Sequence, residues 1–233
     1  MGRLWQGAVL DDDLALVAVA GAALAAAAFL LLGEAGVVDQ LLLGGGGHHD
    51  HLVLAAAAGL DPKRILFADP VDKATLTRRY TEEAVRFIEE SAARDRPFFL
   101  YLAHPMPHEP IHASEDFRGR SAAGIYGDAV EELDWSVGQV LATISELGLA
   151  EKTLVIFTSD NGPWLNYGNH AGSTGPLRGG KGNMWEGGPR VPTVMAWPAM
   201  IPSGKVTDEI GSTIDILPTI ADITGAELPQ NKI

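Results

Sequence analysis

Asp160, Asn161 and Gly162 follow a short apolar run, and the first two side chains carry oxygens that a hard cation can bind. Calcium takes about six to eight oxygen ligands, among them carboxylate and amide oxygens. Aspartate, asparagine and glycine in succession are also typical of a plain turn. The segment by itself therefore leaves a calcium site and a simple turn as alternatives.

His104 and His108 stand on a proline-containing segment directly after a second apolar run. The prolines between them, Pro105 and Pro107, restrict the backbone and predict a stiff loop. A histidine held in this way can donate a proton to a leaving group. A pair of surface histidines with no catalytic role is the alternative interpretation.

A third segment runs from Pro176 to Gly182 and is the most evident cationic loop of an acidic chain. Its glycines let the backbone come close to an anion, and Arg178 and Lys181 supply positive charge. The spacing is not that of a nucleotide-binding P-loop, in which a Gly-Lys pair is followed by serine or threonine. The segment therefore predicts an anion site and not an ATP site.

Charge and composition exclude several classes of protein. The 233 residues include 17 Lys and Arg against 30 Asp and Glu, which gives a formal net charge of -13. Such a charge repels phosphate backbones, so no nucleic-acid partner is expected and an anionic substrate needs a local positive site. The chain contains no cysteine, which excludes disulfide bonds, thiolate zinc sites and a cysteine nucleophile.

Residues 1–60 differ in composition from the rest of the chain. They form a low-complexity apolar segment of mainly Ala, Leu, Gly and Val, and Leu14–Gly33 carries no charge. A helix of about 20 residues spans roughly 30 Å, the thickness of a bilayer core. Three interpretations follow: a signal-anchor, a buried alanine-rich helix, and an N-terminal sequence that is not authentic. The change of composition near Asp61 predicts a second region over 61–233.

The second region has the pattern of an alternating α/β protein. Apolar residues at helical spacing predict helices at about 75–94, 122–147 and 213–224. Short apolar runs predict strands at about 97–102, 153–158 and 191–197. Chemistry in such folds collects at the carboxyl ends of the strands, where His104 and Asp160 stand. The expected apolar face of the second helix consists of Tyr126, Val130, Leu133, Val137, Val140, Leu141 and Ile144.

Several segments of the second region occur together in one order. They are Pro97–His104, His108–Pro110, Tyr126–Asp128, Glu132–Asp134, Thr158–Gly162, Gly180–Gly182, Trp185–Gly188 and Asp215–Thr219. In this order and spacing they resemble the sulfatase family, and the arylsulfatases most closely, over about residues 69–233. The resemblance implies an α/β fold with a mixed, mostly parallel sheet flanked by helices, as in the alkaline phosphatase superfamily. It also implies an incomplete domain, because the matching segments belong to the carboxyl-terminal portion of a sulfatase catalytic domain.

Sulfatases are sulfuric ester hydrolases that use calcium, so the resemblance implies roles for the matching residues. Asp160 and Asn161 correspond to calcium ligands, and Lys181 to the lysine that holds a sulfate oxygen. His108 corresponds to the histidine that contacts the ester and assists departure of the leaving group. These roles agree with the physical argument, because a metal, a fixed ammonium group and a proton donor all stabilise the charge that develops during ester cleavage.

The resemblance also implies roles for residues around the site. His104 can reach the site but is a weaker candidate than His108, and substrate specificity is expected in the loop of Asn169 and His170. Four residues are expected to brace the lysine loop: Glu186, Gly187, Gly188 and Arg190. Three acidic residues are expected to be structural or solvated: Asp128, Glu132 and Asp134.

One feature of the family is missing. Sulfatases make a formylglycine nucleophile from the first residue of a Cys/Ser-x-Pro-x-Arg motif, which this chain does not contain. Without the aldehyde hydrate nothing accepts the sulfuryl group, so we expect the chain to be inactive. Thr174–Arg178 fits the pattern with threonine but lies in the lysine loop. Asp11–Asp13 imitates upstream calcium ligands and His48–His51 can bind a transition metal, but neither is assigned to the site.

Two other functions stay open from the sequence. One is a non-catalytic sulfate-binding or membrane-tethered pseudoenzyme, and the other is a phosphoester or phosphonate hydrolase of the same superfamily. The expected partner is a small-molecule sulfate ester, with a membrane anchor if the apolar N-terminal segment inserts. The resemblance to the family implies an extracytoplasmic location: periplasmic, secreted or lysosome-like.

Overall fold

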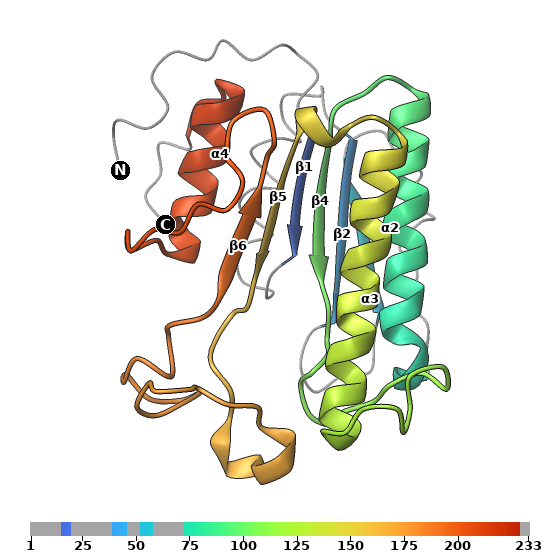
Figure 1. Ribbon diagram of the computed structural model, residues 1–233. Helices are drawn as coiled ribbons and strands as arrows, with labels where there is room; N and C mark the ends of the chain where they lie inside the picture. Colours follow the sequence, from blue (N-terminus) through green and yellow to red (C-terminus); the bar gives the residue numbers. More distant parts are fainter. Residues whose placement is uncertain (1–14, 20–38, 46–51, 58–71, 229–233) are drawn as a thin grey trace.

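The computed structural model describes residues 15–19, 39–45, 52–57 and 72–228, whose strands form one six-stranded sheet (Figure 1). The strand order is β3-β2-β4-β1-β5-β6. Strands β2, β4, β1 and β5 run parallel, and β3 and β6 pair antiparallel at the two edges. This confirms the predicted mixed, mostly parallel sheet. The bounds are β1 Ala15–Val19, β2 Asp39–Gly45, β3 Leu52–Ala57, β4 Phe98–Ala103, β5 Thr153–Thr158 and β6 Thr193–Ala196.

The uncharged run Leu14–Gly33 contains a strand from the centre of the sheet. In β1, Leu16 aligns with Phe99 of β4 on one side and with Leu154 of β5 on the other. The interpretation of this run as a helix is therefore wrong at Ala15–Val19. Pairing on both sides satisfies the backbone hydrogen-bonding groups of β1, and this outweighs the helix propensity of alanine and leucine.

The predicted membrane anchor can be compared with the structure only over the described residues. Among them, no helix combines the length and the apolar character needed to cross a bilayer. Residues 20–33, most of the uncharged run, lie outside the described residues, as does the boundary expected near Asp61. The signal-anchor and the division of the chain near that boundary stay predictions.

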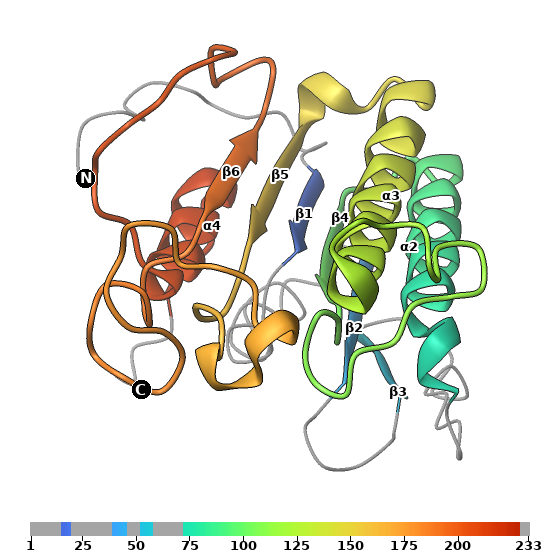
Figure 2. The same cartoon turned by 60° about the horizontal axis from the view of Figure 1, so that its bottom comes forward.

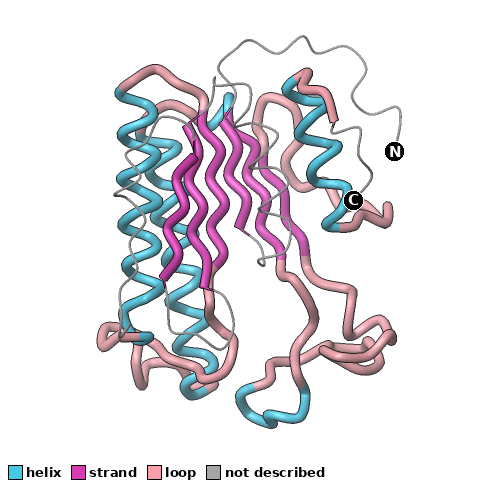
Figure 3. Tube along the Cα trace, turned by 180° about the vertical axis from the view of Figure 1, so that it is seen from behind, coloured by secondary structure: helices cyan, strands magenta, loops and turns pink. Residues whose placement is uncertain are grey.

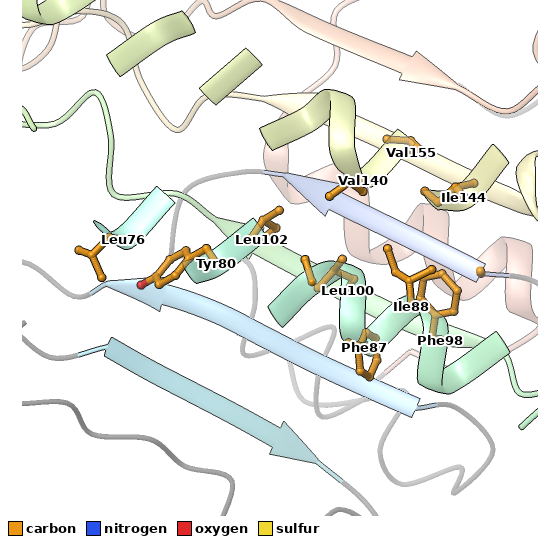
Figure 4. Close-up of a cluster of buried hydrophobic side chains, with 12 residues drawn as sticks. Leu76, Tyr80, Phe87, Ile88, Phe98, Leu100, Leu102, Val140, Ile144 and Val155 are labelled. Atoms are coloured by element: carbon orange, nitrogen blue, oxygen red, sulfur yellow. The ribbon is translucent and has the colours of Figure 1, made fainter. Parts of the chain in front are cut away.

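Helices α2 (Leu76–Ala93) and α3 (Gly124–Glu146) cover one face of the sheet (Figures 1 and 3). The helix expected at about 75–94 is confirmed as α2. It follows the 3-10 turn η2 (Lys73–Thr75), where the Asp72 side chain accepts a hydrogen bond from the Ala74 N–H at 3.1 Å. Side chains of α2, α3, β4 and β5 form the core between these layers, and Figure 4 shows Tyr80, Ile88, Leu100, Leu102 and Val140 among them.

Helix α4 (Ile216–Thr224), which follows the 3-10 turn η5 (Thr213–Asp215), covers the other face. Its residue Ile220 packs in a cluster with Phe99 and Tyr101 of β4. Alternate residues of β4 thus supply the cores on the two faces, as the two-residue period of a strand requires. Gly225 ends α4 with a left-handed backbone conformation, φ 69°, as its position after the predicted helix suggested.

The buried face of α3 matches the predicted apolar face at Val140 and Ile144 but differs from it near the start of the helix. Val130 and Leu141 are exposed, with relative solvent accessibilities of 38% and 42%. Asp128 and Glu132 are buried, with relative solvent accessibilities of 2% and 1%. The reason is a set of hydrogen bonds to the loop that precedes the helix. The Asp128 carboxylate accepts from the backbone N–H groups of Ser121, Gly119 and Arg120, and Glu132 accepts from the Ser114 N–H at 2.8 Å.

Those hydrogen bonds also act on the charge of Asp128. Hydrogen bonds from backbone N–H groups hold the pKa of the Asp128 carboxyl below its usual value, and the bond from Ser121 has the largest effect, ahead of those from Gly119 and Arg120. Asp128 and Glu132 are therefore structural residues, which anchor the loop between β4 and α3. Of the two roles expected for them, structural or solvated, the first is correct.

Candidate functional site

The loops that carry the predicted site residues leave the sheet at one edge. The first follows β4 and contains His104 and His108, and the second follows β5 and contains Asp160, Asn161 and Lys181. Because β4 and β5 both run parallel to β1, which lies between them, their carboxyl ends meet at the same edge. Figure 2 turns this edge forward and shows both loops projecting from it.

Asp160 and Asn161 stand directly after β5, as expected. Asp160 is exposed, and the Asn161 amide Nδ2 donates a hydrogen bond to Asp160 Oδ2 at 2.5 Å. The Ser159 hydroxyl donates to the main-chain oxygen of Asn161 at 3.0 Å, which holds the turn. A carboxylate and a side-chain amide thus lie side by side at the end of a buried strand, with the amide nitrogen facing the carboxylate.

The lysine loop is docked onto this turn by backbone hydrogen bonds. The Lys181 N–H donates to the Pro163 oxygen at 2.9 Å, and the Gly162 N–H donates to the Gly188 oxygen at 2.7 Å. Within the loop, the Gly187 N–H donates to the Arg178 oxygen at 2.8 Å. Residues about twenty positions apart are therefore brought together, and Lys181 is placed beside the Asp160–Asn161 turn.

This docking requires glycines. A Cβ on Gly162 would lie 1.9 Å from the Gly187 oxygen, and one on Gly180 would lie 2.4 Å from the Pro163 oxygen. Gly187 and Gly188 are buried and equally constrained, with backbone oxygens 2.2 Å from each hypothetical Cβ. The glycines therefore serve backbone-to-backbone packing, where the sequence predicted close approach to an anion.

Other side chains of the lysine loop are used within the loop itself. The Arg178 guanidinium lies 3.7 Å from the centroid of the Trp185 ring, a cation–π contact. Arg190 forms an ion pair with Glu186 at 3.5 Å, in agreement with their expected bracing role. The Thr174 hydroxyl donates to the Leu177 oxygen at 3.0 Å, which is a turn contact.

His108 is exposed on the loop after β4. Its Nδ1 lies 2.7 Å from the main-chain oxygen of Glu109. Because a carbonyl oxygen only accepts, Nδ1 carries the proton in this hydrogen bond, and Nε2 is left for a ligand. The Met106–Pro107 and Glu109–Pro110 peptide bonds, on either side of His108, are cis.

His104 lies in a different environment from His108. Its Nε2 lies 3.0 Å from the Ser136 hydroxyl of α3, its ring stacks on Tyr80 of α2 with centroids 5.9 Å apart, and its Nδ1 is buried without a hydrogen-bond partner. Burial lowers the pKa of His104 to about 4. His104 is therefore a neutral histidine packed against the helices, and the weaker candidacy predicted for it agrees with this placement.

Glu109 is a residue that the sequence reasoning missed. Its carboxylate Oε1 accepts a hydrogen bond from His170 Nδ1 at 2.9 Å, and Oε2 accepts from the Ile111 N–H at 3.3 Å. His170 belongs to η4 (Leu165–His170), in the loop after β5 where specificity was expected. The available signal was a carboxylate directly beside His108, but its partner is 61 residues away in the chain.

The oxygens of Asp160 and Asn161 fit a hard cation, because carboxylate and amide oxygens are the ligands that calcium prefers. No group of three or more His, Cys, Asp or Glu residues capable of holding a metal occurs among the described residues. This turn thus supplies two of the several oxygens that calcium needs. Asp11–Asp13 and His48–His51 lie outside the described residues.

The fold and the ordered site segments define a member of the alkaline phosphatase superfamily, and solved structures agree. The PsFucS1 sulfatase from Pseudoalteromonas sp. superimposes with a TM-score of 0.70 at 31% identity, over 76% of this chain and 35% of that one. The sequence profile of the sulfatase family matches residues 44–226. The chain therefore belongs to the sulfatase family, whose members hydrolyse sulfate esters.

Curated relatives give the same result. Human steryl-sulfatase is 44% identical over 173 residues, which make up 72% of this chain and 29% of the relative. Mouse N-acetylgalactosamine-6-sulfatase is 43% identical over 162 residues, 69% of this chain and 31% of the relative. Human arylsulfatase A is 45% identical over 155 residues, which make up 66% of this chain and 30% of the relative. The chain thus spans less than a third of the length of these relatives.

Proposed function

We propose that this chain carries the carboxyl-terminal part of a calcium-dependent sulfate ester site, with Asp160 and Asn161 as metal ligands and Lys181 and His108 as sulfate-contacting residues. The observation that carries the proposal is the docking of the lysine loop onto the strand-end turn, through the Lys181–Pro163 and Gly162–Gly188 hydrogen bonds. This docking brings the backbone of Lys181 close to the turn that carries the Asp160 carboxylate. Asp160 and Asn161 would hold calcium, and the Lys181 ammonium group would add positive charge to the same anion site.

Each residue has one task in this proposal. Bound calcium supplies a Lewis acid that polarises a sulfuryl oxygen. Lys181 holds another sulfuryl oxygen with its ammonium group, and its backbone is fixed by the bond to Pro163. His108 faces the leaving group through Nε2, because its Nδ1 proton is donated to the Glu109 oxygen. Donation to the leaving group therefore requires the doubly protonated ring, with the departing proton on Nε2.

We further propose that the chain binds sulfate esters without turning them over. It has no cysteine, and it lacks the Cys/Ser-x-Pro-x-Arg source of the formylglycine nucleophile. An aryl sulfate and an aryl phosphate are the assay substrates, and we expect hydrolysis of neither. Turnover of the sulfate would contradict this part of the proposal, and turnover of the phosphate would identify a phosphoester hydrolase instead. An extracytoplasmic location stays a prediction.

The calcium site is tested with Asp160→Asn. Removal of the one carboxylate of the turn should weaken calcium binding about tenfold or more, because calcium affinity depends steeply on the number of charged ligands. Isothermal titration calorimetry of the full chain with calcium measures the change. Asp208→Asn, the same change at an exposed loop position, is the matched control and should bind as the wild type does. Equal affinities for both variants would remove Asp160 from the site.

The sulfate contact is tested with Lys181→Ala. Loss of a charge-assisted hydrogen bond should reduce the affinity for inorganic sulfate about tenfold or more, while the melting temperature stays unchanged because the backbone bond of residue 181 is retained. Calorimetry at saturating calcium gives the affinity. Lys205→Ala removes an exposed lysine from another loop and controls for net charge. Sulfate affinity that is unchanged in Lys181→Ala would eliminate this residue as a ligand.

A further inference from the structure

The loops after β4 and β5 are not neighbours in the sheet. Strand β1 lies between β4 and β5, so the two strand ends are about 10 Å apart. A side-chain contact bridges the two loops: His170 Nδ1 of η4 donates to Glu109 Oε1 at 2.9 Å. Because His108 and Asp160 stand on different loops, their relative position depends on what joins those loops.

The His170 side of this contact is seated on α3. Gly172, with φ 72°, lies over Tyr126, and a Cβ at residue 172 would come 2.4 Å from the Tyr126 hydroxyl oxygen. The segment that contains His170 therefore packs against the start of α3. The contact at residue 172 is so close that only glycine fits there. A firmly seated segment can hold its partner.

The Glu109 side of the contact holds three groups at once. Its carboxylate accepts from His170 Nδ1 and from the Ile111 N–H, and its main-chain oxygen accepts from His108 Nδ1 at 2.7 Å. The Glu109 side chain is largely covered, at 21% exposure, while that of His170 is 47% exposed. Glu109 thus connects the ring of His108 directly to the loop after β5.

We propose that Glu109 and His170 act as a positioning pair for His108. The pair fixes the Glu109 backbone, whose carbonyl then selects the Nδ1–H tautomer of His108 and aims Nε2 toward the space between the two loops. Neither residue contacts the substrate in this role. The inference rests on the proposed function in one respect, because a sulfate ester bound at the Asp160–Lys181 site is the group that Nε2 of His108 would contact.

The test measures the tautomer of His108 in the full chain labelled with 15N-histidine. Long-range 1H–15N correlation spectra, recorded where the ring is neutral, give the ratio of the Nδ1–H to the Nε2–H form. We expect His170→Leu, which removes the donor, to lower this ratio for His108 about threefold or more. His170→Asn keeps an N–H group near the position of Nδ1 and should restore most of the ratio.

Two further variants, Glu109→Ala and His112→Leu, complete the test. Glu109→Ala removes the carboxylate acceptor but retains the main-chain oxygen, so it should lower the ratio as His170→Leu does. It replaces His170→Leu in the test if the leucine variant does not fold. His112→Leu changes a histidine of the same loop outside the pair and should leave the His108 ratio unchanged. A lower melting temperature in His170→Leu and Glu109→Ala with an unchanged His108 ratio would show a merely structural contact and overturn the proposal.

The experiment separates this inference from the proposed function. The tautomer ratio is measured without calcium, sulfate or turnover, so it does not depend on ligand binding. Failure of the proposed function would appear as unchanged sulfate affinity in Lys181→Ala, whatever the tautomer ratio. Failure of the positioning role would appear as an unchanged ratio in His170→Leu, whatever the sulfate affinity.

Discussion

Gly162→Ala is expected to separate the lysine loop from the strand-end turn and to abolish the site. The added Cβ would lie 1.9 Å from the Gly187 oxygen and about 3 Å from further backbone atoms of residues 187 and 188, none of which can swing away as a flexible side chain can. Relief of the clash requires the loop to move, and the hydrogen bonds of Gly162 to Gly188 and of Lys181 to Pro163 are then lost. We expect a loss of about 3 kcal/mol or more in the free energy of unfolding and about a hundredfold weaker calcium binding.

Urea unfolding and calcium calorimetry measure the two effects of Gly162→Ala. The matched control is Gly138→Ala in α3, where a Cβ would meet nothing within 4 Å. There the same substitution should stabilise the protein by roughly 0.5–1 kcal/mol, because alanine is the better helix former. A Gly162→Ala protein with wild-type stability and calcium affinity would show that the turn and the lysine loop are not packed as described.

Acid is expected to destabilise the protein between pH 6.5 and pH 4 through His104. Burial lowers the pKa of this histidine to about 4 in the folded chain, from the ordinary value of 6.5. Above pH 6.5 the ring is neutral in both states and has no effect on stability. As the pH falls through this window the unfolded chain binds a proton that the folded chain does not, so stability decreases by roughly 3 kcal/mol in total.

His104→Gln tests the origin of this pH dependence. Glutamine can keep a polar contact near Ser136 but has no proton to gain, so unfolding free energies at pH 7.5 and pH 4.5 should differ by roughly 2 kcal/mol less than in the wild type. The lowered pKa of Asp128 contributes stability that is lost only as the pH falls through values below its ordinary 3.8, outside this window. An equal pH dependence in the wild type and His104→Gln would contradict a buried neutral ring.

Local sequence patterns predicted a helix or strand of the described chain well where the pattern extended over the whole element. Apolar residues at helical spacing predicted α2, and the capping residue Asp72 is used at the turn before it. The run that forms β5, followed by Asp160 and Asn161, located a polar turn at a strand end. Such features depend on residues within a few positions of one another, so they can be read from the order of the residues. The roles of the site residues came from their resemblance to a family and not from these patterns.

The same patterns failed where a distant segment decides the environment. The face of α3 was expected to be apolar, but Asp128 and Glu132 are buried there because the N–H groups of the preceding loop need acceptors. The run that contains Ala15–Val19 was open to a helical interpretation, but these residues form a strand because β4 and β5 provide ladders on both sides. In both cases the satisfaction of backbone hydrogen bonds outweighed the local preference.

The order of the residues was enough to identify the chemical groups, their place after the strands and the membership in a family. Which of these groups meet follows from the three-dimensional packing. It closed the glycine-rich loop onto the turn of Asp160 and joined Glu109 to His170 across 61 residues. Such contacts join residues that are far apart in the chain, so the periodicity of a helix or a strand does not predict them. They arise only after the sheet has set its strand order and brought the carboxyl ends of β4 and β5 to one edge.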